Sequence, residues 1–312
     1  SSFLKKNKTI TTNFTFLPSI APSSIGKCPS NLKNYYKDNH CMIILSLRGM
    51  SLFVALLDKK GSRLISLEKF LINAPWPLIL IIIALLAWIG SRSWFVVSGT
   101  VCSFLLIGYF GMWTDTMATL AIISVSTLLC ISIGIPIGIF MSRSDRLQSI
   151  VTPVLDVMQT IPSFVYLIPV VMLLGIGKVP GLIAVCIYAL PPIVRLTNLG
   201  IRLVDKEVLE AADAFGASYK QKLFDVQIPL ALPNIFAGVN QTIMMALAMV
   251  VIASMIGVKG LGVPVLRAVS NQYLALGMLN GLAIVALAII FDRISQSFGK
   301  RMQKHLESAH GV

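Results

Sequence analysis

The chain has 312 residues, of which 56% are hydrophobic and 12% charged, and its formal net charge is +13. About a quarter of the residues of a soluble domain are charged, so this composition excludes an ordinary soluble protein and the disordered, collagen-like and disulfide-rich classes. Instead it predicts an all-α, polytopic protein in a lipid bilayer, since each transmembrane helix takes about 20 apolar residues. The excess of Lys and Arg fits cytoplasmic loops, and no nucleic-acid partner is expected.

The N-terminal extension, residues 1–69, predicts no clean transmembrane helix. Its first part is polar and rich in Lys, Ser, Asn and Thr, a composition that does not favour a packed structure. The run 42–57 is apolar but short and carries Arg48, so we expect an interfacial segment rather than a span. No signal peptide is expected. Either the extension belongs to the protein, or the natural chain begins later, at Met42 or Met50.

Seven apolar runs then predict transmembrane helices. Two glycine pairs, Gly134 with Gly138 and Gly277 with Gly281, have the four-residue spacing that lets membrane helices approach closely. Most of the Lys and Arg residues between the runs fall on the same side as the loop 198–234. That loop and the C-terminus are therefore expected to be cytoplasmic. The runs are roughly 70–90, 94–113, 115–141, 152–175, 180–197, 235–257 and 275–292.

No enzyme motif accompanies these runs. The sequence has no GxxxxGK[ST] phosphate loop, no HExxH, no GxSxG and no carboxylate pair within the membrane. Its three histidines lie outside the spans, so no metal site is expected. Asp156 is the one ionisable residue expected inside a span, where it has either an interfacial packing role or a functional one. The sequence therefore predicts a transport protein without a catalytic site or cofactor of its own.

The polar stretch 203–230 is patterned as two short helices. Asp205 is a typical N-cap for the first helix, and Gly216 is a typical C-cap residue. Ser218 with Gln221 then forms a capping box that opens a second helix, which is expected to end at Pro229. The first helix either docks into a groove on a partner or folds onto its own membrane domain. Its narrow apolar stripe consists of Val208, Ala211, Ala212 and Phe215.

These residues resemble the EAA motif of the permease subunits of binding-protein-dependent ABC importers. The resemblance rests on Glu210, Ala211, Ala212 and Gly216, followed after nine residues by a segment ending in Pro229. The family pattern ends I-x-L-P, and this chain has Val and Ile at the two aliphatic positions. Residues 156–166, 189–197 and 238–257 are similar to the glycine betaine/proline, or quaternary amine, branch of the family. The resemblance covers about residues 110–297.

The resemblance implies a domain organisation around a five-helix permease core in residues 114–297. Residues 70–113 are then two accessory transmembrane helices, 1–69 an extension, and 298–312 a cytoplasmic tail. Within the core, 198–234 is the coupling loop that sits in a cleft of the ATPase, with Glu210, Ala211, Ala212 and Gly216 as its contact and turn positions.

The resemblance also implies an assembly in the inner membrane of a prokaryote. Two permease subunits pair, most simply as a homodimer, and two separate ATPase subunits bind the ATP. An external substrate-binding protein delivers the solute and largely selects it. In this family the permease itself is not an enzyme.

Five uncharged polar or aromatic residues are candidates for the translocation path: Gln159, Tyr166, Asn240, Gln241 and Ser254. A lining without fixed charge suits a zwitterion or a weakly hydrated cation, whereas a divalent metal needs carboxylate ligands. The same side chains could equally form interhelical hydrogen bonds. No aromatic cage for a quaternary ammonium group is evident in the spans. The alternatives are an importer for another solute, an osmotically gated channel and an intramembrane enzyme. The absence of a charged pore ring argues against the channel, and the absence of a catalytic constellation argues against the enzyme.

Overall fold

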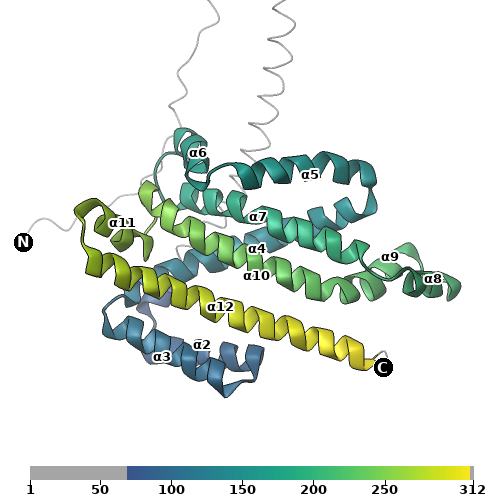
Figure 1. The fold of residues 1–312 in the computed structure, drawn as a ribbon, viewed down its shortest axis with the longest axis horizontal. Helices are drawn as coiled ribbons and strands as arrows, with labels where there is room; N and C mark the ends of the chain where they lie inside the picture. The colour runs from purple at the N-terminus through teal and green to yellow at the C-terminus, as the bar shows by residue number, and fades with distance from the viewer. Residues whose placement is uncertain (1–68, 310–312) are drawn as a thin grey trace, which may run out of the picture. The chain divides into compact units, whose positions relative to one another are not determined.

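The computed structural model describes residues 69–309, and within this range every regular element is a helix. The predicted interfacial segment 42–57 lies outside the described residues. Figure 1 shows the arrangement. The elements are α2 (Trp76–Ser91), α3 (Trp94–Tyr109), α4 (Trp113–Arg143), α5 (Asp145–Thr160), η1 (Ser163–Tyr166), α6 (Leu167–Leu174), α7 (Lys178–Arg202), α8 (Lys206–Ala214), α9 (Tyr219–Gln221), η2 (Lys222–Gln227), α10 (Ile228–Ala253), η3 (Ser254–Ile256), α11 (Gly262–Asn271) and α12 (Leu274–Ala309).

The centre of the fold is α7, which packs along both α4 and α10 (Figure 1). Its residues from Pro180 to Cys186 are buried without interruption, as expected for a helix surrounded by other helices. On the other side of α10 lies α12, and α2 and α3 pack against α12. The fully buried large side chains come mainly from these central helices and include Ile122, Met141, Leu182, Ile193, Met249 and Leu287.

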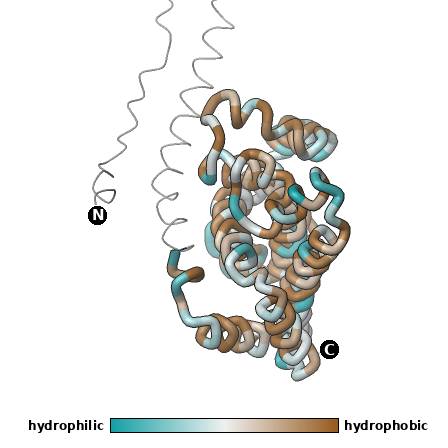
Figure 2. Tube along the Cα trace, turned by 90° about the vertical axis from the view of Figure 1, so that its left-hand side faces the viewer, coloured by the Kyte–Doolittle hydropathy of each residue, from teal (hydrophilic) through white to brown (hydrophobic). Residues whose placement is uncertain are grey.

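The outer surface is apolar as well. Hydrophobic residues follow the helices on all sides in Figure 2. Phe95 is 87% exposed and Met172 is 81% exposed, although both lie in apolar helices. A water-soluble protein does not present so much apolar surface, whereas contact with lipid tails stabilises it. The described helices are therefore arranged for a bilayer.

Four helical stretches are long and apolar enough to cross a membrane: Trp113–Arg143, Lys178–Arg202, Tyr219–Ile256 and Leu274–Ser297. A fifth crossing is made only if α5 and η1–α6 count together, although they meet at an angle of 106°. The helices α2 and α3 are apolar but have 16 residues each. All seven predicted runs are thus helical, and four or five of them meet the length of a full span.

Two of the predicted runs differ from the structure at a proline. The run 152–175 was expected to be one helix, and it breaks at Ile161, which is extended (φ −66°, ψ 128°) before Pro162. A residue that precedes proline is pushed out of the α region, so the break is a local consequence of the sequence. The run 70–90 begins its long helix only at Trp76, because Pro75 is extended and provides the N-cap position.

The glycine pair in α4 makes the close helix contact that its spacing predicts. Gly138 faces Thr197 of α7, and a Cβ added at Gly138 would lie 2.6 Å from the Cβ of Thr197. Gly134 is in similar contact with Ile193. The second pair behaves differently: Gly277 approaches Ala268 of α11, whereas an added Cβ at Gly281 would meet no atom within 4 Å. Only the first pair brings two long helices together.

We predict that Gly138→Ala destabilises the α4–α7 contact. The added methyl group would also come within 2.9 Å of the Val194 carbonyl oxygen, which cannot move freely, so overpacking of about 1–3 kcal/mol is expected. Thermal unfolding in detergent, followed by labelling of the buried thiols of Cys130 and Cys186, should show a lower midpoint. The matched control Gly281→Ala should leave the midpoint within about 1 °C of the original; equal midpoints for both variants would contradict the packing.

Candidate functional site

The first helix of the predicted coupling loop carries its own start and stop signals. The Asp205 carboxylate accepts a hydrogen bond from the backbone N–H of Glu207 at 3.0 Å, which caps the N-terminus of α8. At the other end, Gly216 adopts a left-handed conformation (φ +74°). The N–H groups of Gly216 and Ala217 donate to the carbonyls of Asp213 and Ala212, respectively, which is a Schellman motif. The two predicted caps of this helix are confirmed.

The second helix of the loop begins as predicted but does not end as predicted. Ser218 and Gln221 form the capping box that opens α9. The helix then passes through the π-turn η2 and continues without interruption into α10, so the expected end at Pro229 is wrong. Pro229 occupies one of the first two positions of α10, where a proline is tolerated. The π-turn directly before α10 changes the hydrogen-bond pattern, so that α-helical bonding starts anew at α10 although the helix is continuous.

The apolar stripe of α8 is largely uncovered. No residue of α8 is buried, and Phe215, directly after it, is 93% exposed. Glu210 and Ala211 are exposed, while Val208 and Ala212 are partly covered on the side where α8 packs against η2. Within the described residues the stripe is therefore not folded onto the helix bundle. This leaves a surface of the kind that a docking partner requires.

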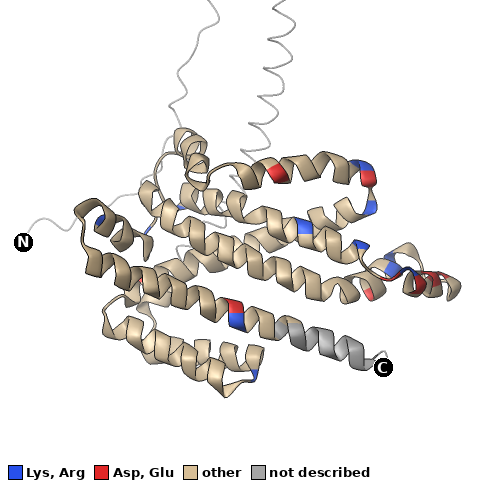
Figure 3. Cartoon of the chain, viewed as in Figure 1, with Lys and Arg blue, Asp and Glu red and all other residues tan. Residues whose placement is uncertain are grey.

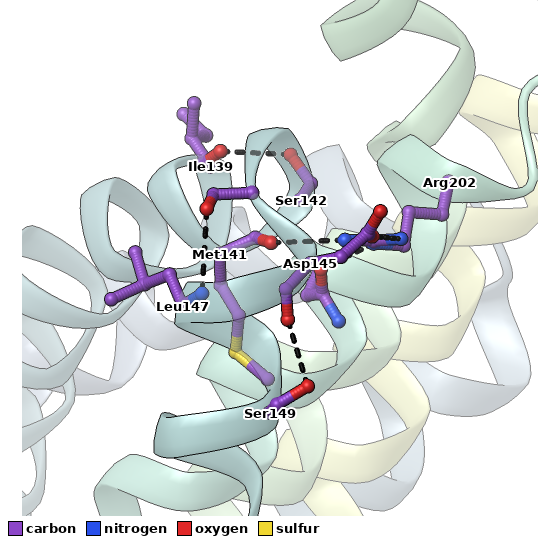
Figure 4. A network of polar contacts seen from close by, with 9 residues as sticks. Ile139, Met141, Ser142, Asp145, Leu147, Ser149 and Arg202 are labelled. Atoms are coloured by element: carbon purple, nitrogen blue, oxygen red, sulfur yellow. Dashed lines mark hydrogen bonds and ion pairs between the residues drawn. The ribbon is translucent and has the colours of Figure 1, made fainter.

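The base of the predicted coupling loop is fixed to the turn between α4 and α5 (Figure 4). The guanidinium group of Arg202, the last residue of α7, makes an ion pair with Asp145 at 2.7 Å. It also donates to the carbonyl oxygen of Met141 and to the side-chain oxygen of Asn198, both at 3.2 Å. Sequence reasoning missed this contact, because the two partners are 57 positions apart and only the fold brings them together.

Two further interactions hold the loop itself. The Arg143 guanidinium lies 4.6 Å from the centre of the Tyr219 ring, a cation–π contact between the α4–α5 turn and α9. Lys222 pairs with Asp213 at 2.5 Å and thereby links η2 to α8. Figure 3 shows charged residues of both signs gathered over α8 and α9 and at the α4–α5 turn. The geometry thus makes α8, η2 and the base of α10 one connected unit.

A pocket of about 740 Å³ lies beside α10 and α12, and we call it the polar pocket. Asn240 and Gln241, two of the predicted path residues, line it from α10. Asp292 of α12 lines it as well, and the Asn240 side-chain amide donates to its carboxylate at 2.8 Å. The other residues that line the pocket are Tyr188, Pro233, Phe236, Ala237, Met244, Met245, Ala248, Ser295, Gln296 and Gly299.

The remaining three predicted path residues lie elsewhere. Gln159 is exposed on α5. The hydroxyl group of Tyr166 donates to the carbonyl of Met158, and its ring lies 5.9 Å from the ring of Tyr188, edge to face. Ser254 is buried, and its hydroxyl group donates to the carbonyl of Val251 at 2.6 Å. The structure therefore brings together two of the five residues, and it connects Tyr166 to the pocket only through Tyr188.

The expectation that Asp156 is the sole ionisable residue inside the spans is wrong. Asp156 forms an ion pair with Arg195 of α7, and Asp292 lies within the membrane-length stretch Leu274–Ser297 of α12. Asp292 was placed at the end of an apolar run. The four-residue spacing of Asp292 and Gln296 is the sequence signal that the helix continues. In the structure the amide nitrogen of Gln296 lies 2.7 and 2.8 Å from the two carboxylate oxygens of Asp292.

Comparisons with known proteins agree on one family. Residues 134–304 match the family described as the binding-protein-dependent transport system inner membrane component. The chain is 51% identical over 233 residues to the glycine betaine/proline betaine transport system permease protein ProW of Escherichia coli, covering 75% of this chain and 66% of that protein. It is 48% identical over 229 residues to the glycine betaine/carnitine transport permease protein GbuB of Listeria monocytogenes, covering 73% and 81%, respectively. The chain thus spans slightly less than two thirds of the E. coli protein.

A solved structure supports the fold. One chain of the inward-facing MetNI methionine ABC transporter superposes with a TM-score of 0.55 at 20% identity, covering 59% of this chain and 93% of that chain. At this identity the likeness concerns the fold alone. The family match and the relatives above show that the chain belongs to the family of binding-protein-dependent transport system inner membrane components.

Proposed function

We propose that the chain is the permease subunit of an ATP-driven importer of glycine betaine or a related quaternary amine. The observation that carries this proposal is the high identity to relatives with such names. Besides the two above, the glycine betaine transport system permease protein OpuAB of Bacillus subtilis is 47% identical over 224 residues and is covered to 79%. A trimethylamine N-oxide permease of Ruegeria pomeroyi follows at 35%. Glycine betaine, carnitine and trimethylamine N-oxide all carry a trimethylated nitrogen, which defines the proposed substrate class.

The proposed architecture has seven spans, with a five-helix core in 114–297 and two accessory helices in 70–113. Support for the accessory spans comes from the four tryptophans of the chain: Trp76, Trp88, Trp94 and Trp113. All four lie in the first or last turn of α2, α3 or α4, and tryptophans favour the membrane–water interface. The 16-residue helices α2 and α3 are about 24 Å long, somewhat shorter than the bilayer core. Interfacial tryptophans at their ends would accommodate this mismatch.

The proposed coupling element is α8, which docks onto an ATPase subunit that binds the ATP. Glu210, Ala211, Ala212 and Gly216 are the proposed contact and turn positions, and Pro229 marks the passage into α10. The uncovered stripe of α8 and the exposed Phe215 support this role. Two ATPase subunits, a second copy of the permease and an external binding protein would complete the importer. The loop and the C-terminus would face the cytoplasm, in an inner membrane.

The proposed mechanism is alternating access. ATP binding and the solute-loaded binding protein would each favour different states of the permease, which is the requirement for coupling. A movement of α8 would reach α10 through η2, because Tyr219–Ile256 is one continuous helical stretch of 38 residues. It would reach the α4–α5 turn through Arg202, which is bonded to Asp145 and Met141. The permease would contribute the path, and the ATPase the hydrolysis.

Uptake tests the proposed substrate class. Cells that lack their own osmolyte importers and express this permease with its ATPase and binding protein should accumulate labelled glycine betaine. Cells with the permease omitted are the control. Accumulation of an unrelated solute, with none of glycine betaine, choline or proline, would contradict the substrate class and leave the importer class standing.

Labelling from one side of the membrane tests the orientation. In a cysteine-free background, Ser218→Cys should be protected from an impermeant maleimide in intact cells, and Ser270→Cys should react. Both serines are exposed at the surface of the fold, and expressing the permease without its ATPase keeps Ser218 uncovered, so neither result can be attributed to burial. Reaction of both positions in intact cells would exclude the proposed topology, whereas lysed cells should show reaction of both.

Backbone strain tests the coupling role. Gly216→Val should reduce uptake more than tenfold while the protein remains in the membrane, because valine disfavours the left-handed conformation that ends α8. Gly111→Val is the matched control: Gly111 has φ +73° in the α3–α4 turn, has no atom within 4 Å of an added Cβ, and should retain most uptake. Glu210→Lys should reduce co-purification of the ATPase. Normal uptake and co-purification in both loop variants would argue against α8 as the coupling element.

A further inference from the structure

The described lining of the polar pocket carries one negative charge. Asp292 is the one charged side chain among the residues that line it. Its carboxylate accepts hydrogen bonds from the amides of Asn240 and Gln296, which are neutral donors, and no ion pair is found for it among the described residues. The neighbouring Arg293 lines a different hollow, together with Phe95 and Val96. Among the side chains that the structure describes, the charge of Asp292 is therefore oriented by hydrogen bonds and has no ion-pair partner.

A second carboxylate in the spans shows the contrast. Asp156 of α5 is paired with Arg195 of α7, so its charge is compensated within the protein. A charge placed in a membrane helix without a counter-ion is costly, and such residues commonly mark a substrate or ion pathway. Asp156 fits a structural role by this criterion, whereas Asp292 fits a functional one.

The pocket also contains an acceptor without a partner. The side-chain oxygen of Asn240 is buried and receives no hydrogen bond within the described part of the chain, while the nitrogen of the same amide is bonded to Asp292. A buried polar atom without a partner costs free energy and calls for an explanation, such as an absent ligand. Because both Asp292 and this oxygen are acceptors, the missing group is one that carries positive charge or polarised hydrogens.

The walls of the pocket suit an alkylated cation. Tyr188 and Phe236 provide aromatic rings, and Met244 and Met245 provide polarisable thioethers. Aromatic rings attract quaternary ammonium groups through cation–π interaction. A metal ion is disfavoured, because the pocket has a single carboxylate and the described residues contain no group of three metal ligands. The volume of about 740 Å³ lies in the usual range for small-molecule sites.

We infer that the polar pocket is a transit site for the trimethylammonium group of the solute, with Asp292 as its counter-charge. This inference rests on the proposed function and deepens it. The cationic end lies against Asp292, the Asn240 oxygen and the aromatic rings, and the amide of Gln241 is available to the carboxylate end of a zwitterion. One carboxylate in an open pocket holds such a group weakly, as release toward the next compartment requires.

A protection experiment tests the pocket directly. The permease–ATPase complex, without binding protein, carries Ser295→Cys as a reporter in a background without its natural cysteines. Alkylation of the reporter by a maleimide is timed with choline or with 3,3-dimethylbutanol, which has the same shape without the charge. Choline at millimolar concentrations should slow alkylation at least threefold, and the uncharged compound should not. Asp292→Asn should abolish the protection and Asp292→Glu should retain most of it.

The matched control is Asp156→Asn, which removes a carboxylate from a different membrane helix and should leave the protection by choline unchanged. Equal protection in Asp292→Asn, or by the uncharged compound, would show that the pocket does not select a cation. A reporter that stays inaccessible with and without choline would mean that the pocket is closed in the assembled complex, which also overturns the inference.

Uptake measurements distinguish a failure of this inference from a failure of the proposed function. If the unaltered importer accumulates no quaternary amine, the proposed function fails. If it accumulates glycine betaine and Asp292→Asn lowers the maximal uptake rate tenfold or more at an unchanged KM, the transit site is supported, since the binding protein sets the KM. If it accumulates glycine betaine and Asp292→Asn transports at the same rate, the inference alone fails.

Discussion

The close contact of α7 with α4 and α10 is the constraint on which the other features depend. Glycine makes this contact close: Gly138 lies against Thr197, and Gly238 of α10 lies against Ile193. Held in this way, α7 presents Tyr188 to the polar pocket and Arg202 to the α4–α5 turn. A wider spacing between α7 and its neighbours would move these groups apart. Closely packed interiors cannot make up such a gap by small shifts of side chains. The pocket and the loop are therefore positioned by one helix.

The proposed coupling loop and the polar pocket are connected by rigid structure. The loop is fixed at its entry by the bonds of Arg202 and at its exit by the continuous helix into α10. Asn240 lies on that same α10 and is bonded to α12 through Asp292. A displacement at α8 would thus be transmitted to both sides of the pocket, whereas a flexible exit from the loop would absorb it. For the proposed alternating access, this arrangement would connect the movement of α8 to a second packed state of the helices.

Local signals were readable from the sequence and long-range pairings were not. The caps of α8 at Asp205 and Gly216 were predictable because capping depends on neighbouring residues. The two prolines behave differently: Pro162 follows a break, whereas Pro229 lies inside a continuous helix, shortly after a π-turn that packs against α8. The bond between Asn240 and Asp292 joins residues 52 positions apart, so no local pattern reveals it. Asp292 therefore appeared as a residue at the end of a span.

The self-contained caps of α8 have a consequence for divergence among importers. Asp205 closes one end of the helix and Gly216 the other, and neither bond involves a residue outside the stretch from Asp205 to Ala217. The outward side chains between them do not take part in these bonds. If α8 docks onto an ATPase as proposed, substitutions at such positions, apart from Asp213, which pairs with Lys222, would change which nucleotide-hydrolysing protein is recognised while the helix keeps its length. A recognition surface built in this way would change without altering the two caps that define the helix.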